Sequence, residues 1–305
     1  MKLQQLKYVR EIARRGLSIS AASNAMHTSQ PGVSNQVQLL EDELGLQIFE
    51  RHGKRLTGLT PFGQLVIKMA DRVLLDVENI RQLAADSKND QLGTLSIGTT
   101  HTQARYALPK AIKAFSQHYP KVHLNMVQGT PTEIAEMAAT GRVDIAIATE
   151  GLTQFDALVI LPCYEWNRSL VVPPGHPLLS EKKLTLKAIA DYPLLTYAMG
   201  VTGRAQQDQA FIEQGLTPNV VFTATDADVI KTYVELELGI GIIASMAFDA
   251  AKDAPLQSLD VSHLFKPSTT YMGIRRGSYL RGFSYAFIEH LAPHLTQKLV
   301  EKAII

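Results

Sequence analysis

The sequence contains a single cysteine, Cys163, and no apolar run long enough to cross a membrane. One cysteine forms neither an intramolecular disulfide nor a cysteine cluster for a metal, so nothing here indicates an oxidising compartment. A membrane span needs roughly 18 consecutive apolar residues, and residues 1–16 lack the apolar core of a signal peptide. We therefore expect a soluble cytoplasmic protein with no membrane partner.

A large excess of charge of either sign is also missing. There are 30 Lys and Arg against 29 Asp and Glu, with 46% hydrophobic and 19% charged residues. This composition excludes intrinsic disorder, and the near-neutral total does not by itself indicate a nucleic-acid binder. The charge is unevenly distributed, because residues 1–60 hold eight basic and five acidic side chains, a net +3, and the remainder carries −2. A basic N-terminal segment favours nucleic-acid contact.

Catalytic and metal motifs are absent from the sequence as well. It has no nucleophile elbow, Walker A loop, dinucleotide fingerprint or His-Glu-x-x-His motif, and its nine histidines are scattered. Cys163 beside Pro162 is interpreted as a small buried residue rather than a reactive thiol. We expect neither an enzyme nor a metal site.

What the sequence does contain begins with a predicted helix-turn-helix. After a first amphipathic helix, Ser18 or Ser20 can cap a second helix, and Thr28 or Ser29 can cap a third that has Pro31 in its first turn. The buried stripe of the third helix is expected to comprise Val33, Val37, Leu40 and Leu44. Two short helices joined by a tight turn, the second with a polar leading end, predict this DNA-binding motif.

A basic turn follows the third helix. Residues 50–57 place Gly53 among basic side chains between short extended pieces, which we interpret as a wing. Basic groups hold the phosphate backbone, while amides and hydroxyls read base edges. The predicted DNA contacts are Ser29, Gln30, Pro31, Ser34, Asn35 and Gln38 on the helix, and Arg51, Lys54 and Arg55 on the wing.

A long helix is predicted next, since residues 64–89 lack glycine and proline. Apolar residues repeat along it in two series, Val66, Val73 and Ile80, and Ala70, Val77 and Ala84. Such a stripe either pairs with a second copy as a coiled coil or packs on the chain's own body. We favour the dimer, because a helix-turn-helix usually reads paired half-sites.

Beyond Gly93 strand-like and helical runs alternate, which predicts parallel sheets flanked by helices in two small α/β lobes. The expected strands are 94–99, 122–127, 144–149, 169–172, 194–197, 220–223 and 239–245, and the expected helices are 104–118, 131–140, 204–213 and 226–238. We expect the chain to cross between the lobes at 161–163 and to return at 265–267. The predicted domains are 1–60 (winged helix-turn-helix), 61–89 (linker helix) and 90–305, in which lobe I is 90–162 with 266–305 and lobe II is 163–265.

Three strand-to-helix junctions carry donors that suit a small anion. They lie at residues 96–104, 197–204 and 223–227. Ligands of open α/β sheets bind at strand ends, where helix N-termini present free amides. Threonine hydroxyls and the Gln103 amide are neutral donors, which favour a small oxyanion or carboxylate over a polyphosphate. The alternative is that Thr100, Thr202 and Thr225 only cap their helices, and Trp166 either lines a cleft or belongs to the core.

Several stretches carry a resemblance to a known family. In the first 63 residues they are 20–22, 28–34, 39–45, 49–51 and 59–63, and in the remainder 99–109, 161–164, 166–168 and 223–233. The first set resembles the LysR-type bacterial transcriptional regulators. The second is similar to the CysB-like branch, which regulates cysteine biosynthesis and sulfate assimilation. The likeness extends to about Thr296.

The resemblance implies a winged helix-turn-helix (all-α with a small wing), a long linker helix and an α/β two-lobed effector domain like periplasmic binding proteins. It implies a homotetramer, a dimer of dimers, on double-stranded promoter DNA, with RNA polymerase as a further partner. No cofactor is expected; the implied effector between the lobes is sulfate or an acetylserine (O-acetylserine or N-acetylserine). The implied effector contacts are Thr100, Thr102, Gln103, Thr149, Trp166 and Thr202.

Two features depart from the family's pattern. Asn35 and Gln38 stand where relatives often carry Arg or Lys, and Phe62 stands where a small residue is common. We therefore expect DNA affinity to depend more on the wing. The alternatives are a small-anion-binding protein without a DNA role, a regulator of alternative sulfur sources that responds to adenosine phosphosulfate, and an enzyme acting on acetylserine or a sulfate ester.

Overall fold

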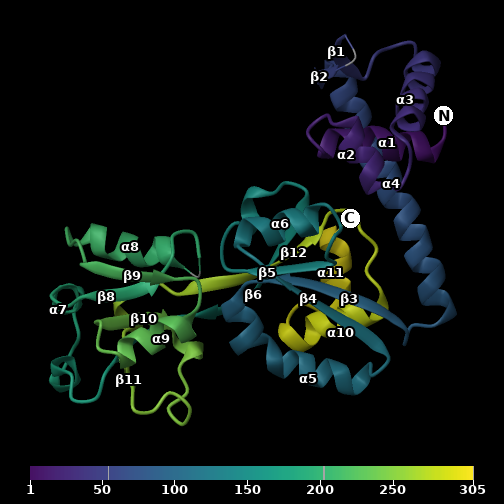
Figure 1. The fold of residues 1–305 in the computed structure, drawn as a ribbon. Coiled ribbons are helices and arrows are strands. Elements are labelled where there is room, and N and C mark those ends of the chain that lie inside the picture. The colour runs from purple at the N-terminus through teal and green to yellow at the C-terminus, as the bar shows by residue number, and fades with distance from the viewer. Residues whose placement is uncertain (54, 202, 305) are drawn as a thin grey trace. The chain divides into compact units, whose positions relative to one another are not determined.

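The computed structural model describes residues 1–53, 55–201 and 203–304 (Figure 1). The chain forms two compact units, Met1–Ala85 and Asp86–Ile305. The predicted DNA contact Lys54 and the predicted effector contact Thr202 lie outside the described residues. Across the described ranges, none of the helices combines the length and hydrophobicity that a membrane span requires.

The first unit opens with the predicted helix-turn-helix. Its helices are α1 (Leu3–Arg14), α2 (Ile19–Ala25) and α3 (Gln30–Leu44). Ser18 caps α2 and Ser29 caps α3, each hydroxyl accepting a backbone N–H, at 3.1 and 3.2 Å. Pro31 lies in the first turn of α3, and Gly45 ends that helix in the left-handed conformation with a φ of 70°. These local signals are confirmed.

The buried face of α3 differs from the prediction at its C-terminal end. Val33, Val37 and Leu40 are buried as predicted, but Leu44 is 37% exposed. Glu41 is buried instead, at 1% exposure. Its carboxylate accepts hydrogen bonds from the backbone that follows α3. The last turns of α3 therefore bury an acidic side chain, where the apolar pattern predicted a buried leucine.

The wing and the linker helix complete this unit. β1 (Phe49–His52) and β2 (Arg55–Leu59) pair antiparallel, which confirms the wing. α4 (Pro61–Lys88) follows directly. A Cβ on Gly63 would overlap the Ile48 carbonyl oxygen, so the helix start packs against the backbone before β1. Ala70 and Leu74 of α4 are buried in the core of the unit, while Leu65, Met69, Val73, Ile80 and Leu83 are exposed along α4.

The second unit contains two five-stranded sheets. In lobe I the spatial order is β4 (Val122–Gln128), β3 (Gly93–Thr99), β5 (Ile145–Ala148), β12 (Ser268–Arg275) and β6 (Leu158–Trp166). In lobe II it is β11 (Gln257–Asp260), β7 (Arg168–Val172), β10 (Ile240–Ala244), β8 (Leu194–Tyr197) and β9 (Val220–Ala224). The prediction of parallel sheets is right for β4, β3 and β5 and for β9, β8 and β10. It is wrong for β6, β7, β11 and β12, which pair antiparallel.

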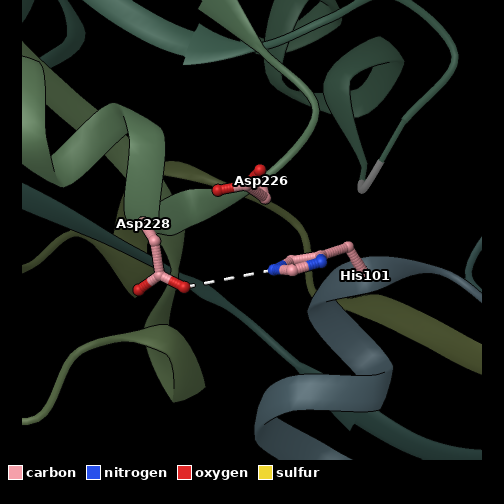
Figure 2. Close-up of side chains that lie close together, drawn as sticks. All are labelled: His101, Asp226 and Asp228. Atoms are coloured by element: carbon pink, nitrogen blue, oxygen red, sulfur yellow. Dashed lines mark ion pairs between the residues drawn. The ribbon is translucent and has the colours of Figure 1, made fainter.

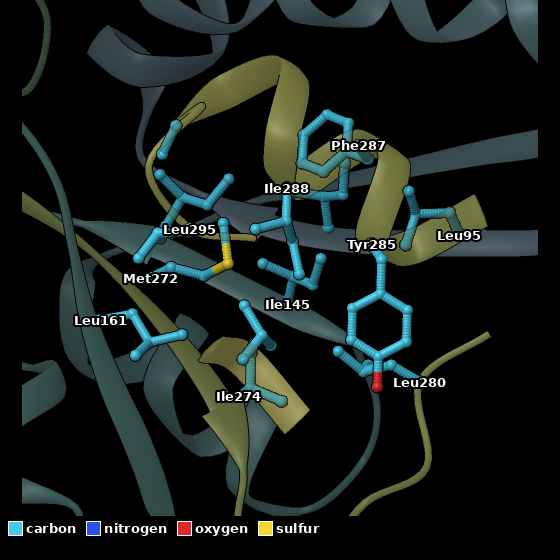
Figure 3. Close-up of a cluster of buried hydrophobic side chains, with 14 of the residues drawn as sticks. Leu95, Ile145, Leu161, Met272, Ile274, Leu280, Tyr285, Phe287, Ile288 and Leu295 are labelled. Atoms are coloured by element: carbon cyan, nitrogen blue, oxygen red, sulfur yellow. The ribbon is translucent and has the colours of Figure 1, made fainter. Parts of the chain in front are cut away.

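Helices cover both faces of the lobe I sheet. Along β5, Ile145 and Ile147 face one core, and Ala146 and Ala148 face another. The first core packs under α5 (Leu108–His118), α10 (Gly282–Leu291) and α11 (Gln297–Ile304), and the second under α6 (Pro131–Ala139). Figure 3 shows the first core, with Met272 and Ile274 of β12 below Phe287 and Ile288 of α10.

Lobe II has its own helices, and short turns occur in both lobes. Its helices are α7 (Leu186–Ala190), α8 (Arg204–Glu213) and α9 (Ala227–Glu235). The short turns are the π-helix η1 (Gln103–Ala107) and the 3-10 turns η2 (Leu152–Gln154), η3 (Pro177–Ser180), η4 (Ser245–Ala247) and η5 (Ser262–Leu264).

The chain crosses from lobe I to lobe II at Asn167, between β6 and β7. The sequence prediction put this crossing at 161–163, but those residues lie inside β6, which stays paired with β12 as far as the Trp166–Ser268 pair. The chain returns through Phe265–Pro267, as predicted, between η5 and β12. The chain thus leaves lobe I at the end of β6 and re-enters it at the start of β12, which pairs antiparallel with β6.

Candidate functional site

The predicted effector residues of lobe I lie at one edge of its sheet. Thr100 follows β3, and Thr149 follows the neighbouring parallel strand β5. Trp166 ends β6; since β5 and β6 both run antiparallel to β12, their carboxyl ends share this edge. This is the edge at which open α/β sheets bind ligands. We call it the carboxyl edge.

Gln103 is held at this edge by both ends of its amide. It is 1% exposed, its Nε2 donates to Thr270 Oγ1 at 3.1 Å, and its Oε1 accepts from the Tyr164 hydroxyl. Gln103 also begins the π-helix η1, a wide turn of a kind found frequently at functional sites. An amide nitrogen carries two hydrogens, so the second N–H of Gln103 is able to serve a ligand.

Thr102 connects the two lobes. It is fully buried, and its hydroxyl hydrogen-bonds the phenol of Tyr197 at the end of β8. The same phenol oxygen accepts the Ala244 N–H at 3.2 Å. Burial raises the pKa of Tyr197, so this phenol stays neutral at physiological pH. Thr102 therefore already has a partner in lobe II, and its role as an effector contact stays a prediction.

Three buried polar atoms of the effector unit have no hydrogen-bond partner in the described part of the chain. They are Nε1 of Trp166, Oε1 of Glu150 and Nε2 of Gln207. Trp166 is 6% and Gln207 1% exposed. Buried polar groups are almost always paired, so each of these atoms calls for a partner such as a water, an ion or a ligand. The carboxyl edge thus offers the Trp166 donor and the Glu150 acceptor, while the Gln207 donor lies on α8 of lobe II.

Arg168, which the sequence analysis did not single out, is buried at the crossing between the lobes. Its guanidinium donates to the carbonyl oxygens of Lys266 at 3.2 Å and Gly203 at 2.7 Å, and to Ser268 Oγ at 2.9 Å. It also stacks on Trp166, with 5.4 Å from Cζ to the ring centroid. A cation at the start of an apolar strand was the available sequence signal.

Glu150 follows Thr149 and carries the unpaired acceptor. Burial raises the pKa of its carboxyl, while a hydrogen bond from the Gly203 N–H and the nearby charge of Arg168 act to lower it. Among the described residues, no group donates to the second oxygen, Oε1. The carboxyl edge therefore holds a half-buried acidic group beside its neutral donors.

A second polar cluster joins the lobes through Asp228 of α9. The Tyr106 hydroxyl of η1 donates to Asp228 Oδ1 at 2.6 Å, and Lys231 Nζ lies 3.2 Å from the same oxygen. Arg105 pairs with Asp228, and Lys231 also pairs with Asp253 at 2.8 Å. Burial would raise the pKa of Asp228, but the hydrogen bonds from Tyr106 and Lys231 and the charge of Arg105 lower it. The carboxylate stays ionised and holds η1 against α9.

This cluster contains a group of three potential metal ligands, His101, Asp226 and Asp228. Figure 2 shows His101 pointing at Asp228 from the opposite lobe, with Nε2 4.0 Å from Oδ2 and Asp226 beside them. Asp226 caps α9 by accepting the Val229 N–H at 2.9 Å, so Thr225 is not the cap. Asp228 is already neutralised by Arg105 and Lys231. We therefore assign the group to the contact between the lobes.

In the first unit, the predicted DNA contacts lie on the leading turns of α3. Ser29, Gln30, Pro31, Asn35 and Gln38 are exposed, and Ser34 is half-buried. Gln30 and Arg55 of the wing line one cavity of about 400 Å³ together with Ser18 and Ser20. The start of α3 and the basic wing therefore face a common hollow.

The two described arginines of the wing differ in their partners. Arg51 Nη2 lies 2.7 Å from the buried carboxylate of Glu41, so much of its charge is neutralised within the protein. Arg55 is exposed and makes no ion pair with any described residue. Arg55 is therefore the better candidate for a phosphate contact.

Comparison with known proteins identifies the domain to which each unit corresponds. Residues 3–64 match the model of the bacterial regulatory helix-turn-helix proteins of the lysR family, and residues 88–296 match the LysR substrate binding domain. The chain belongs to the LysR family of transcriptional regulators. Members bind DNA through the helix-turn-helix domain and a small effector through the second domain, and they are not enzymes.

Several relatives of this LysR-type regulator align over almost the whole chain. It is 50% identical to the transcriptional regulator SsuR of Burkholderia cenocepacia, over 97% of this chain and 96% of SsuR. It is also 50% identical to CysB of Haemophilus influenzae, over 99% and 94% of the two chains. It is 46% identical to Cbl of Escherichia coli, over 95% and 92%.

Solved structures show the same two parts. The cofactor-binding domain of the Cbl transcriptional regulator matches 71% of this chain and 95% of its own, with a TM-score of 0.69 and 44% identity. A full-length OxyR variant of Pseudomonas aeruginosa matches 95% and 97%, with a TM-score of 0.68 at 24% identity. The winged helix-turn-helix and the two-lobed effector domain are thus confirmed.

Proposed function

We propose that this LysR-type regulator controls genes of cysteine biosynthesis and sulfate assimilation in response to a small sulfur-linked effector, sulfate or an acetylserine, bound between the lobes. Its relatives named CysB, SsuR and Cbl, at 46–50% identity over at least 95% of the chain, support this biological role. The unpaired Nε1–H of Trp166 at the carboxyl edge is the single observation that carries the effector site.

The donors at this edge suit a compact anion. Thr100 is buried at 6% exposure, and no described side chain hydrogen-bonds its hydroxyl. Hydroxyl, amide and indole donors can each give one short hydrogen bond to an oxyanion or carboxylate. Arg168 supplies a positive charge close to Trp166, although its terminal nitrogens are committed to protein acceptors. An effector with one anionic group fits this set.

A Thr100→Val variant is expected to bind sulfate, N-acetylserine and O-acetylserine about tenfold more weakly, the loss of one hydrogen bond worth roughly 1.4 kcal/mol. Valine keeps the shape of threonine, so the fold is retained. Isothermal titration calorimetry of the full chain measures the change. Thr94→Val is the matched control, because Thr94 is exposed at the other end of β3. Equal affinities for Thr100→Val and wild type would exclude Thr100 from the site.

The DNA-binding half of the proposal predicts two distinct effects on promoter binding. Arg55→Ala should weaken binding to all sequences alike and reduce the salt dependence of log K by about one unit, because one phosphate contact is lost. Gln30→Ala or Ser34→Ala should instead change sequence preference, by about 1–3 kcal/mol at one base pair. Gel shifts with a cysteine-biosynthesis promoter fragment and a scrambled fragment, at several salt concentrations, separate these effects.

The control for these gel shifts is Lys187→Ala, which removes the same charge from an exposed site on α7 of the effector unit. Uniform loss of affinity in both kinds of variant would show that the assignment of base reading to α3 and of phosphate contact to the wing is wrong. Absence of any shift with the wild-type chain at low salt would favour the alternative of a small-anion-binding protein without a DNA role.

We also propose that the regulator acts as a homotetramer in the cytoplasm, with RNA polymerase as a partner at the promoter. The exposed apolar residues of α4 support self-association. Leu65, Met69, Val73, Ile80 and Leu83 recur at three, four or seven positions along this helix. A stripe of this spacing is covered when two helices pair as a coiled coil, and two copies place two recognition helices on adjacent half-sites.

A further inference from the structure

The short turn η1 contacts the carboxyl edge at one end and lobe II at the other. Its first residue, Gln103, is held at the carboxyl edge by the hydrogen bonds of its amide. Three positions later, the Tyr106 hydroxyl donates to Asp228 Oδ1 at 2.6 Å, and Asp228 lies in the first turn of α9 in lobe II. The position of Gln103 is therefore connected to lobe II through Tyr106.

The aromatic ring of Tyr106 also packs on lobe II. It is half-buried against a core cluster that includes Val171, Tyr197 and Ile230, all of lobe II. Lys231 Nζ lies 5.4 Å from the centre of this ring and 3.4 Å from its hydroxyl oxygen. A cation at this distance from an aromatic ring is attracted to it. Tyr106 thus makes apolar and polar contacts with the opposite lobe.

The acceptor of the Tyr106 hydrogen bond is positioned by lobe II itself. Lys231 is 6% exposed and pairs with Asp228 at 3.2 Å and with Asp253 at 2.8 Å. It also donates to the Ala247 carbonyl oxygen at 2.9 Å. The buried ammonium of Lys231 is therefore compensated within lobe II, and the Tyr106 hydroxyl adds the link from Asp228 to lobe I.

Arg105 pairs with the same carboxylate but contributes less to this link. Its side chain is 56% exposed. Exposed ion pairs are screened by water and salt, and they stabilise a structure little. The hydrogen bond from Tyr106 to Asp228 is half-buried and has an ionised acceptor, and such charge-assisted bonds are the stronger ones. The hold on η1 therefore depends mainly on Tyr106.

We propose that Tyr106 is a positioning residue of the effector site, which acts through Asp228 to hold η1 and the two lobes in the arrangement that binds the effector. This inference rests on the proposed effector function and adds a residue outside the predicted contacts on which affinity depends. A contact between the lobes raises the population of the binding-competent arrangement, and the apparent affinity is proportional to that population. Loss of the Tyr106 hydroxyl therefore weakens effector binding, although it removes no predicted effector contact.

Tyr106→Phe keeps the packed ring and removes only the hydroxyl. In calorimetry of the full chain we expect each of sulfate, N-acetylserine and O-acetylserine that binds the wild type to bind about tenfold more weakly. Asp228→Ala removes the acceptor, while Lys231 keeps Asp253 and Ala247 as partners. Because both variants break the same bond, the double variant should bind no more weakly than Asp228→Ala. Independent contributions would instead multiply to about a hundredfold loss.

Hydrogen exchange of the full chain without effector tests the hold on η1 directly. In Tyr106→Phe, peptides that cover η1 and the first turn of α9 should exchange faster, while peptides of the first unit serve as the standard. Tyr192→Phe is the matched control, because Tyr192 is also half-buried and packs on His176 within lobe II, with 4.6 Å between ring centroids. It should change neither exchange nor affinity.

Unchanged exchange at η1 in Tyr106→Phe would overturn the inference. So would a loss of affinity from Tyr106→Phe that persists in full in the Asp228→Ala background. If Thr100→Val weakens binding and Tyr106→Phe does not, the proposed effector site stands and the role of Tyr106 is rejected. A wild-type chain that binds none of the three ligands rejects both the proposed effector function and the role of Tyr106 in it.

Discussion

Replacement of Glu41 by alanine is expected to lower the stability of the first unit by about 3 kcal/mol and to abolish DNA binding at physiological temperature. Glu41 Oε1 accepts the backbone N–H groups of Ile48 and Phe49, at 2.8 and 3.1 Å, and Oε2 pairs with Arg51 at 2.7 Å. Alanine would leave two buried donors unpaired where α3 meets the wing. In a unit of this size such a loss lowers Tm by more than about 10 °C.

Hydrogen exchange followed by mass spectrometry localises the effect of Glu41→Ala. Peptides that cover α3 and β1 should lose protection, while peptides of the effector unit serve as the internal standard. Asp42→Ala is the matched control, because Asp42 is the next residue of α3 and is exposed, so we expect a change within about 0.5 kcal/mol. Glu41→Gln should fall between the two, since its amide oxygen still accepts from both N–H groups. Unchanged protection in Glu41→Ala would disprove this role.

Glu41 also illustrates what sequence patterns can and cannot predict. The caps Ser18 and Ser29 and the terminator Gly45 were predictable, because each acts on residues within a few positions of itself. Glu41 belongs to an acidic run that is typical of a solvated surface. It is buried because α3 meets the start of β1, where its hydrogen-bond partners lie seven, eight and ten positions away. No local pattern contains that contact.

The effector unit shows the same limit at larger separation. The central strands β3, β5, β8 and β10 were predictable, since buried parallel strands form short apolar runs next to helices. β6 and β12 were not predicted, because their pairing joins residues about a hundred positions apart, as Trp166 and Ser268 show. The first crossing was misplaced for this reason. It depends on where that long-range pairing stops.

The candidate site was predictable in its neutral donors but not in its charges. Strand ends and the family resemblance pointed to Thr100, Gln103 and Trp166, which the structure brings to the lobe I sheet edge. Arg168 and Glu150 were not among the predicted effector contacts, because their partners belong to the other lobe or to the distant crossing. Charges that are buried by tertiary contacts carry no signature in the neighbouring sequence.

Arg168→Met is expected to lower the free energy of unfolding of the effector unit by about 3 kcal/mol or more, because the groups that the buried guanidinium contacts lose their partner. Methionine fills part of the space beside Trp166 but donates nothing. The carbonyl oxygens of Gly203 and Lys266 lose their donor, as does Ser268 Oγ, and the half-buried Glu150 loses its compensating charge. Since these groups lie at both crossings, the lobes should also hold the effector less well.

Trp166 is the only tryptophan of the chain and lies against Arg168, so its fluorescence during urea unfolding reports on this unit. Arg276→Met is the matched control. Arg276 also donates to carbonyl oxygens, of Asp156 and Leu158 at 3.5 and 3.4 Å, but from an exposed position, and its loss should cost less than about 1 kcal/mol.

Arg168→Lys separates charge from geometry. Lysine keeps the positive charge near Glu150, but its ammonium cannot reproduce the planar fork that reaches Gly203, Lys266 and Ser268 together. We therefore expect about half of the methionine variant's loss of stability. If Arg168→Met and Arg276→Met unfold at the same urea concentration as wild type, the buried guanidinium does not hold the crossing together. If only the lysine variant matches wild type, charge alone is sufficient there.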